Sequence, residues 1–212
     1  MSNKPRHRQT LVLAMALALV VVGFGVVTLG NRSASSTPPA LAVRQGIGKQ
    51  DAAEQTPLFA DADQRLAYLR WLGASGQKLK DTLPNAAERR EFLQTVWFES
   101  HRAGLDTALV MGVIETVSNF RKFHVAENGS RGYMGVSPHW TQVLADGDAA
   151  KLFHLQTNLR FGCVLLRRYL DARQGDLPQA LADYYQNNLG IEGQSPSQSQ
   201  FVGRVLANQR HW

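Results

Sequence analysis

The feature that most constrains this 212-residue chain is an uninterrupted apolar run from Leu11 to Leu29. Its nineteen positions hold no charged residue, and Thr28 is the polar exception among them. A helix of about 20 apolar residues crosses the hydrocarbon core of a bilayer. The run therefore predicts a membrane-spanning anchor over residues 10–30.

The residues in front of this run predict its orientation. Residues 1–9 carry Lys4, Arg6 and Arg8, and basic flanks stay on the cytoplasmic side of a membrane. We therefore expect a cytoplasmic tail over 1–9 and a single-pass inner-membrane protein whose C-terminal domain is periplasmic. The alternative is a cleaved signal sequence, whose apolar core usually has about 7–15 residues; the domain would then be exported.

The remainder of the chain divides at a change in composition. Residues 31–57 are rich in Ser, Pro, Gly, Ala and Gln and contain few large apolar side chains, which predicts a flexible stalk. Over 58–212 apolar residues recur at helical spacing instead, so we expect one mainly α domain. Within it, residues 127–138 hold three glycines and a proline, which predicts a turn or a small β-hairpin.

Capping residues and apolar stripes predict the individual helices. Asn85 and Asp106 are good N-caps for helices that begin just after them. Further helices are expected over 152–172, 177–185 and 201–211, with a turn at 187–190 and a loop at 193–200. The first three stripes are Leu66, Leu69 and Leu72, then Phe92, Leu93, Val96 and Trp97, and then Val110, Val113, Ile114 and Val117.

Composition excludes several classes of function. The chain has 23 Lys+Arg and 17 Asp+Glu residues and a net charge of +6, and three of the cations lie in the basic tail. The mildly basic remainder shows no basic patch, so we expect no nucleic-acid partner. A single cysteine, Cys163, excludes an intrachain disulfide and a Cys-based zinc site. The histidines lack metal-ligand spacing, so we expect no metal and no cofactor.

Four segments from Ala103 onward have a familiar order and spacing. They are AGLDTALVMGVIETVSNF, GSRGYMGVSPHW, TNLRFGCVLLRRYL and GDLPQALADYY. Together they resemble the soluble lytic transglycosylase (SLT) domain, and the resemblance spans roughly residues 58–212. It implies a lysozyme-like helical fold whose partner is the glycan strand of peptidoglycan, the polymer of the cell wall.

The first two motifs of the family carry over with two losses. Its Glu-Ser-x-Phe motif corresponds to Val117-Ser118-Asn119-Phe120, which keeps the serine and the phenylalanine and lacks the catalytic glutamate. Its Gly-x-Met-Gln motif becomes Gly132-Tyr133-Met134-Gly135, which lacks the glutamine. Both losses fall on positions that line the cleft in the family.

The last two motifs are better kept. The family's Asn-x-x-x-Gly is intact at Asn158 and Gly162, and its tyrosine region is Tyr184-Tyr185-Gln186-Asn187. A tyrosine ring can stack on the apolar face of a sugar while its hydroxyl forms a hydrogen bond. The resemblance therefore implies substrate-binding roles for six residues, which are Ser118, Phe120, Tyr133, Met134, Tyr184 and Tyr185.

The missing glutamate matters because glycosidic cleavage requires an acid to protonate the leaving oxygen. Valine at position 117 has no proton to donate. Two other carboxylates are candidate acids. Glu115 lies two residues upstream, which is about 200° around a helix, so it is expected to point away from the side that Val117 faces. Glu127 lies at the start of the glycine-rich segment, which borders the cleft in the family.

Three functions stay open after these considerations. The first is a catalytically degenerate SLT-domain protein, a pseudoenzyme that binds glycan strands without cutting them. The second is an active lytic transglycosylase that uses Glu115 or Glu127 as its general acid and base. The third is a helical scaffold of an envelope protein complex, without affinity for glycan. The loss of the glutamate favours the first.

Overall fold

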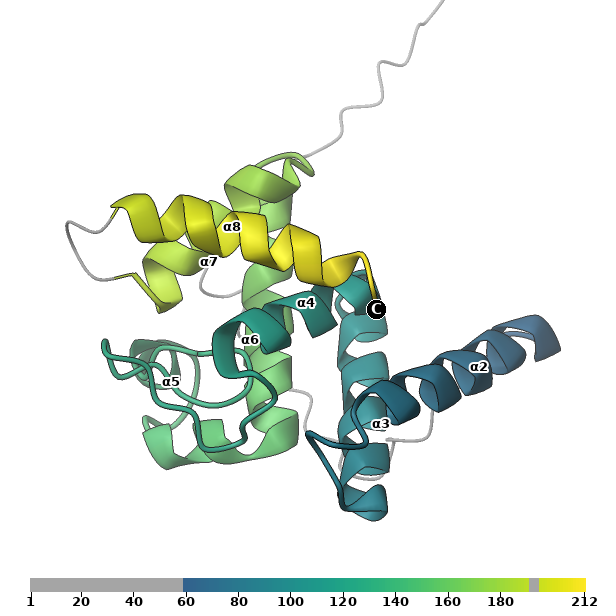
Figure 1. Ribbon diagram of the computed structural model, residues 1–212. Coiled ribbons are helices and arrows are strands. Elements are labelled where there is room, and N and C mark those ends of the chain that lie inside the picture. Colours follow the sequence, from purple (N-terminus) through teal and green to yellow (C-terminus); the bar gives the residue numbers. More distant parts are fainter. Residues whose placement is uncertain (1–58, 191–194) are drawn as a thin grey trace, which may run out of the picture. The chain divides into compact units, whose positions relative to one another are not determined.

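The computed structural model describes residues 59–190 and 195–212, and this part of the chain is mainly helical, which confirms the predicted α class. The predicted tail, anchor and stalk (1–9, 10–30 and 31–57) lie outside the described residues. No helix within 59–190 and 195–212 is long and apolar enough to cross a membrane. The elements are α2 (Ala62–Lys78), α3 (Ala86–Arg102), α4 (Thr107–Ser118), α5 (His139–Leu144), the 3₁₀ helix η1 (Ala149–Phe153), α6 (Leu155–Ala172), α7 (Leu177–Asn188) and α8 (Ser195–Gln209) (Figure 1).

Side chains just before the helices explain where most of them begin. Asn85 accepts hydrogen bonds from two backbone N–H groups of α3, at 3.0 and 3.1 Å, and Asp106 accepts one of 2.8 Å from the first turn of α4. Both predicted caps are therefore confirmed. Asp61, Asp148 and Asp176 cap α2, η1 and α7 in the same way. Each of these bonds satisfies a backbone donor that has no partner within its own helix.

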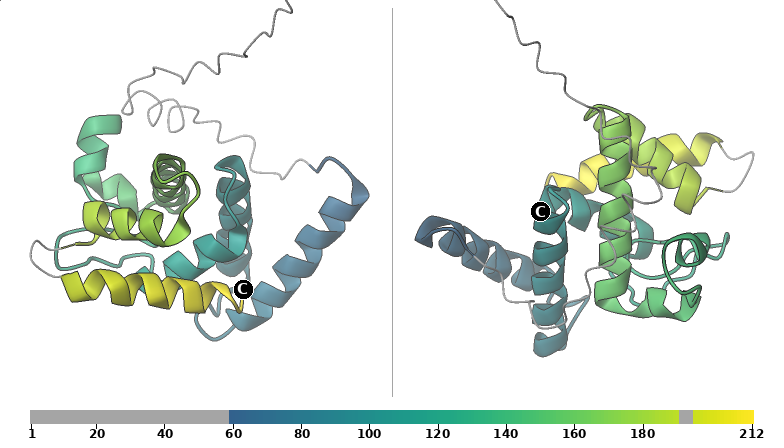
Figure 2. Two further views of the ribbon diagram at one scale, coloured as in Figure 1. Left: turned by 90° about the horizontal axis from the view of Figure 1, so that it is seen from above. Right: turned by 180° about the vertical axis from the view of Figure 1, so that it is seen from behind.

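The core forms where α6 meets its neighbours. α6 packs against α3 and against α7, and one view in Figure 2 shows it end-on among the other helices. α4 and α8 lie side by side in Figure 1 and Figure 2. Gly112 permits this approach, because a Cβ there would lie 2.9 Å from the backbone nitrogen of Gln209 and 2.9 Å from the carbonyl oxygen of Val205.

The predicted β-hairpin at 127–138 does not form. Within 59–190 and 195–212 no strand is present, and the region has two isolated antiparallel bridges that join Arg131 to Val125 and to Val136. Gly129, Gly132 and Gly135 all have positive φ angles, of 83°, 77° and 62°. Because the chain turns at every third residue, no stretch remains long enough for a ladder of paired strands.

Several helix boundaries also differ from prediction. α7 continues three residues beyond the predicted end at 185, because the amides of Asn187 and Asn188 donate to carbonyls one turn back in their own helix instead of forming a turn. α8 begins inside the predicted loop 193–200; a proline, here at 196, is compatible with the first turn of a helix. The helix expected over 152–172 is preceded by η1, with an extended residue at His154 between them.

Two of the three leucines in the predicted apolar stripe of α2 are exposed, and the third, Leu72, packs against the core. Leu66 and Leu69 are 44% and 50% exposed, whereas Tyr68 is buried and packs edge-on against Trp97 of α3, with ring centroids 5.1 Å apart. α2 therefore contacts α3 through the aromatic side chains of Tyr68 and Trp71, and the described residues leave Leu66 and Leu69 uncovered.

Candidate functional site

The segments that carry the predicted motifs meet in one place, at the end of α4, the loop 128–137, the start of α6 and the end of α7. The glycine-rich loop carries Met134, whose backbone is held from two sides. Its N–H donates to Asn158 Oδ1 at 2.8 Å, and its carbonyl accepts from the hydroxyl of Tyr184 at 2.7 Å. Asn158 of the third motif and Tyr184 of the fourth thus fix the position of Met134 in the second.

Asn158 is the central link of this arrangement. Besides accepting from Met134, its Nδ2 donates to the carbonyl oxygens of Arg131 and Leu152, at 2.8 Å each. The side chain is fully buried. Gly132 provides the space, since a Cβ there would overlap the Asn158 amide. The pairing of Gly132 with Asn158 therefore has a steric reason.

The end of α7 closes the loop from the other side. Asn128 Nδ2 donates to the carbonyl oxygen of Asn188 at 2.7 Å, and Ser130 Oγ donates to the same oxygen. Buried Asn188 in turn accepts a long bond, of 3.5 Å, from the N–H of Ser137. Sequence reasoning missed these three residues, Asn128, Ser130 and Asn188, because it assigned the first two to a hairpin and the third to a turn.

At the centre of the site Val117 faces Gly135 and Leu189. A Cβ on Gly135 would lie 2.7 Å from Val117 Cγ1 and 2.5 Å from Leu189 Cδ2. Both side chains are half-buried and lie directly against the backbone of Gly135. The absence of a side chain at position 135 therefore lets Val117, at the end of α4, and Leu189, at the end of α7, both pack against the loop backbone.

Most residues assigned to substrate binding are part of the core. Ser118, Phe120, Tyr133, Met134 and Tyr184 are all buried, and Ser118 donates to the carbonyl of Ile114. Burial and the nearby carboxylates of α3 raise the pKa of Tyr133 to about 12. Tyr185 is half-buried and packs on Phe201 with ring centroids 5.3 Å apart. In this conformation none of the five buried side chains offers a face to a ligand.

The two candidate acids lie in different surroundings. Glu115 points toward the segment that follows α8, where its Oε2 accepts from Trp212 Nε1 at 2.7 Å and lies 3.2 Å from His211 Nε2. It therefore faces away from Gly135. Glu127 is exposed in the turn 126–129, directly before Asn128, which bonds to the end of α7.

A third carboxylate, Glu99, is buried between α3 and α6. Arg160 donates to Glu99 Oε1 from Nε at 3.3 Å and from a terminal nitrogen at 3.2 Å, and both residues are less than 5% exposed. Burial raises the pKa of Glu99 although the guanidinium opposes this shift. Cys163 is also buried, and burial raises the pKa of its thiol. Glu99 is therefore inaccessible to a ligand in this conformation, and its contact with Arg160 links α3 to α6.

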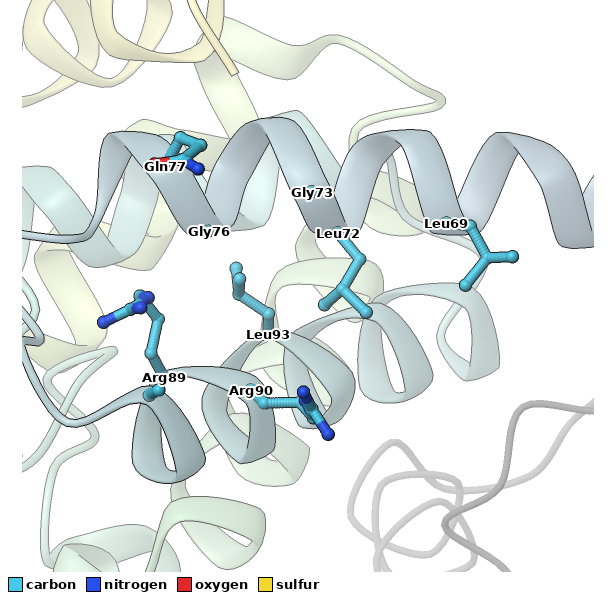
Figure 3. A pocket seen from close by; sticks show the side chains of 9 residues that line it. Leu69, Leu72, Gly73, Gly76, Gln77, Arg89, Arg90 and Leu93 are labelled. Carbon is cyan, nitrogen blue, oxygen red and sulfur yellow. The ribbon is translucent and has the colours of Figure 1, made fainter.

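The α2–α3 groove is a cavity of about 350 Å³ on another part of the domain (Figure 3). Gly73 and Gly76 of α2 face it from one side, and Leu93 rises toward them from α3. Arg89 and Arg90 line its α3 side, and the Arg89 guanidinium donates to the carbonyl of Pro84 at 3.1 Å. None of the described residues that line the groove is acidic, so they supply no carboxylate for acid–base chemistry.

Comparisons of the chain with protein-family models, curated proteins and solved structures found no match. In the part of the chain that the structure describes, no three His, Cys, Asp or Glu side chains are grouped closely enough to hold a metal ion.

Proposed function

We propose that residues 58–212 are a divergent SLT-type domain with a lysozyme-like fold, which binds peptidoglycan glycan strands and does not cut them. The observation that carries this proposal is that Val117 lies directly against the backbone of Gly135, as Leu189 also does. The first two of these residues occupy the positions where the SLT pattern has its glutamate and its glutamine. Apolar groups and a glycine thus occur together where a catalytic cleft needs polar groups.

The meeting of the motifs supports the resemblance beyond their order in the sequence. The loop around Met134, the start of α6 and α7 are joined by the hydrogen bonds of Asn158 and Tyr184, and the end of α4 lies against the same loop where Val117 approaches Gly135. Residues far apart in the chain therefore surround one point, as the motifs of a single site do. The residues kept from the pattern are those that pack.

The chemistry argues against cleavage at this point. Protonation of a leaving oxygen by one positioned acid contributes roughly 10²–10⁴-fold to the rate, and Val117 supplies no proton. Glu115 does not replace it, because its carboxylate accepts from Trp212 on the opposite side of α4. Binding needs no acid, so loss of the glutamate removes the acid–base step and does not by itself remove an affinity for glycan.

A second candidate function is an active lytic transglycosylase that uses Glu127. One observation favours this alternative over an enzyme based on Glu115. The neighbouring residue, Asn128, bonds to Asn188 at the end of α7, so the turn that carries Glu127 lies against one of the elements that surround Val117. In this alternative a movement of the exposed turn brings the Glu127 carboxylate to the scissile oxygen.

We further propose that residues 10–30 anchor the protein in the inner membrane, with the tail 1–9 in the cytoplasm and the domain in the periplasm. The support is the apolar run Leu11 to Leu29 and the basic residues before it. The stalk 31–57 then lets the domain reach the wall. A position there suits an envelope protein complex as a further partner, and a scaffold role without glycan affinity is the remaining alternative.

The test uses the full-length chain in a detergent that has neither a sugar nor an ammonium head group. Purified peptidoglycan sacculi are mixed with the protein, sedimented and analysed for anhydro-muropeptides. We expect the protein to sediment with the sacculi and to release no anhydro product. Protein that stays in the supernatant contradicts the binding proposal and favours the scaffold.

Variants distinguish the two forms of the proposal. Glu127→Gln leaves sedimentation unchanged if the protein is a pseudoenzyme, and it abolishes anhydro product if Glu127 is the acid. Glu91→Gln, at an exposed position of α3, is the matched control for the loss of one charge. The double variant Val117→Glu and Gly135→Gln restores the pattern of the family, and anhydro product from it alone is the strongest support for a degenerate site.

A further inference from the structure

A cavity of about 360 Å³ lies between α2, α3, the start of α4 and Trp212. Its lining includes three of the four tryptophans of the chain, Trp71, Trp97 and Trp212, together with His101, Asp106 and Thr107. We name it the tryptophan cavity. The residues of α4 that line it, Thr107 and Ala108, lie at the opposite end of that helix from Val117, about 15 Å away along the axis at 1.5 Å per residue. None of the described residues that line the cavity is Val117, Gly135 or Leu189.

The rings on the α2–α3 side of the cavity hold one another in place. Trp71 and Trp97 have centroids 5.2 Å apart at 46°, and Trp97 is stacked on His101 at 4.0 Å and 25°. The His101 ring is fixed in turn, because its Nδ1 donates to the carbonyl of Trp97 at 2.9 Å. These contacts produce an aromatic wall that is formed before any ligand arrives.

Trp212 forms the other wall and is held by α4. Its Nε1 donates to Glu115 Oε2 at 2.7 Å, and the edge of Phe120 contacts its ring at a centroid distance of 5.4 Å. Lys78 Nζ lies 5.3 Å from the centroid of the same ring. Glu115, a candidate acid from the sequence, is therefore a positioning residue for this wall.

The polar groups of the cavity are mainly acceptors. Asp106 is exposed; its Oδ1 caps α4 and its Oδ2 accepts a long bond of 3.3 Å from Gln209. With Nδ1 of His101 acting as a donor, Nε2 of the neutral ring is an acceptor. Trp71 Nε1 is a buried donor without an acceptor among the described residues.

We propose that the tryptophan cavity binds one neutral pyranose ring of a sugar. The apolar C–H face of the ring packs against the tryptophans, and the hydroxyl groups donate to Asp106 and to His101. The volume lies within the range of small-molecule sites, which combine aromatic lining with a few oriented polar groups. The inference rests on other residues than the proposed function and does not depend on it.

Other ligand classes fit this cavity less well. A cation would stack on indole rings, but the ammonium of Lys78 already lies over Trp212 and repels a second positive charge. An anion meets the carboxylate of Asp106. A purely apolar ligand removes water from Asp106 and His101 and returns no hydrogen bond. A sugar alone among these brings apolar faces and uncharged donors together.

The experiment follows the four indole N–H signals of the full-length chain by NMR, in the same sugar-free detergent, during titration with glucose and with N-acetylglucosamine. We expect saturable shifts at Trp71, Trp97 or Trp212 and none at Trp140, which lies in α5 and is the internal control. Choline serves as the cationic probe. Absence of saturable shifts, equal shifts at Trp140, or tighter binding of choline than of either sugar overturns the proposal.

Two variants assign the binding to this cavity. Asp106→Asn keeps the helix cap and an acceptor oxygen and removes the charge, and Trp212→Phe keeps an aromatic ring and removes the indole. Each is expected to weaken sugar binding by about three- to tenfold, the range of one aromatic or charge-assisted contact, while Trp140→Phe leaves it unchanged. Sugar binding of wild-type strength in both variants refutes the assignment. Sacculus sedimentation of the Val117 variants tests the other site, so either result stands without the other.

Discussion

Replacement of Asn158 by alanine tests whether one buried amide holds the glycine-rich loop. The side chain makes three hydrogen bonds of 2.8 Å, with the Met134 N–H and with the carbonyls of Arg131 and Leu152. A typical bond contributes about 1 kcal/mol, and a buried backbone group left without a partner costs about 1–3 kcal/mol. For three such groups we expect Asn158→Ala to lower the free energy of unfolding by about 3–6 kcal/mol, a large part of the roughly 5–15 kcal/mol of a whole domain.

The assay is urea unfolding followed by circular dichroism, with amide hydrogen exchange at Met134 as a local measure. Asn187→Ala is the matched control, because Asn187 is exposed and donates one hydrogen bond, of 2.8 Å, to the carbonyl of Asp183. We expect this control to change the free energy of unfolding by less than about 1 kcal/mol. Equal losses in the two variants, or unchanged protection of the Met134 amide in Asn158→Ala, would refute the reasoning.

Three further outcomes follow from buried or crowded positions. Gly135→Ala should lower the free energy of unfolding by about 1–3 kcal/mol more than Gly147→Ala, as measured by thermal unfolding. Both glycines have a positive φ angle, but the space at position 147 is open and two apolar side chains crowd position 135. Equal losses in the two variants would contradict this crowding. Glu99→Ala should cost about 3–5 kcal/mol in urea unfolding, as expected when a buried ion pair loses one member, and a loss below 1 kcal/mol contradicts the pairing with Arg160. Burial raises the pKa of Glu99, so the folded state binds the proton of this carboxyl group more tightly than the unfolded state does. Protonation of Glu99 therefore contributes fully to the free energy of unfolding below about pH 4.3, and this contribution falls as pH rises through the raised pKa. Glu99→Gln should lack this fall, and an identical pH dependence in the two proteins would contradict it.

Local signals in the sequence predicted the helices that begin at a cap. Asn85 and Asp106 marked the starts of α3 and α4 because a capping side chain and its backbone donors lie within three residues of each other. The same local logic failed at Asn188, where an asparagine that favours turns bonds back into its own helix. Whether such a side chain ends a helix or extends it depends on the loop that packs against it, which the sequence does not specify.

The sequence motifs gave an expectation of which segments meet, and much less information about the direction of their side chains. The motif order placed the end of α4, the glycine-rich loop and the end of α7 together without any contact information. Tyr184, however, was assigned to sugar binding, and the structure buries it completely. Its spacing of three residues from Leu181 and four from Asn188 could have shown that it shares their buried face. The resemblance to a binding residue outweighed that signal.

The direction in which Glu115 points from α4 makes it a less suitable acid than Glu127 for the alternative enzyme. Glu115 and Val117 are separated by about 200° on the helix, and Glu115 bonds to Trp212 on the side away from Gly135. An enzyme based on Glu115 must break that bond and rewind the last turn of a helix that packs closely against α8. An enzyme based on Glu127 must move an exposed turn. Because the second change disturbs far fewer buried contacts, Glu127→Gln is the variant whose activity distinguishes a pseudoenzyme from a working one.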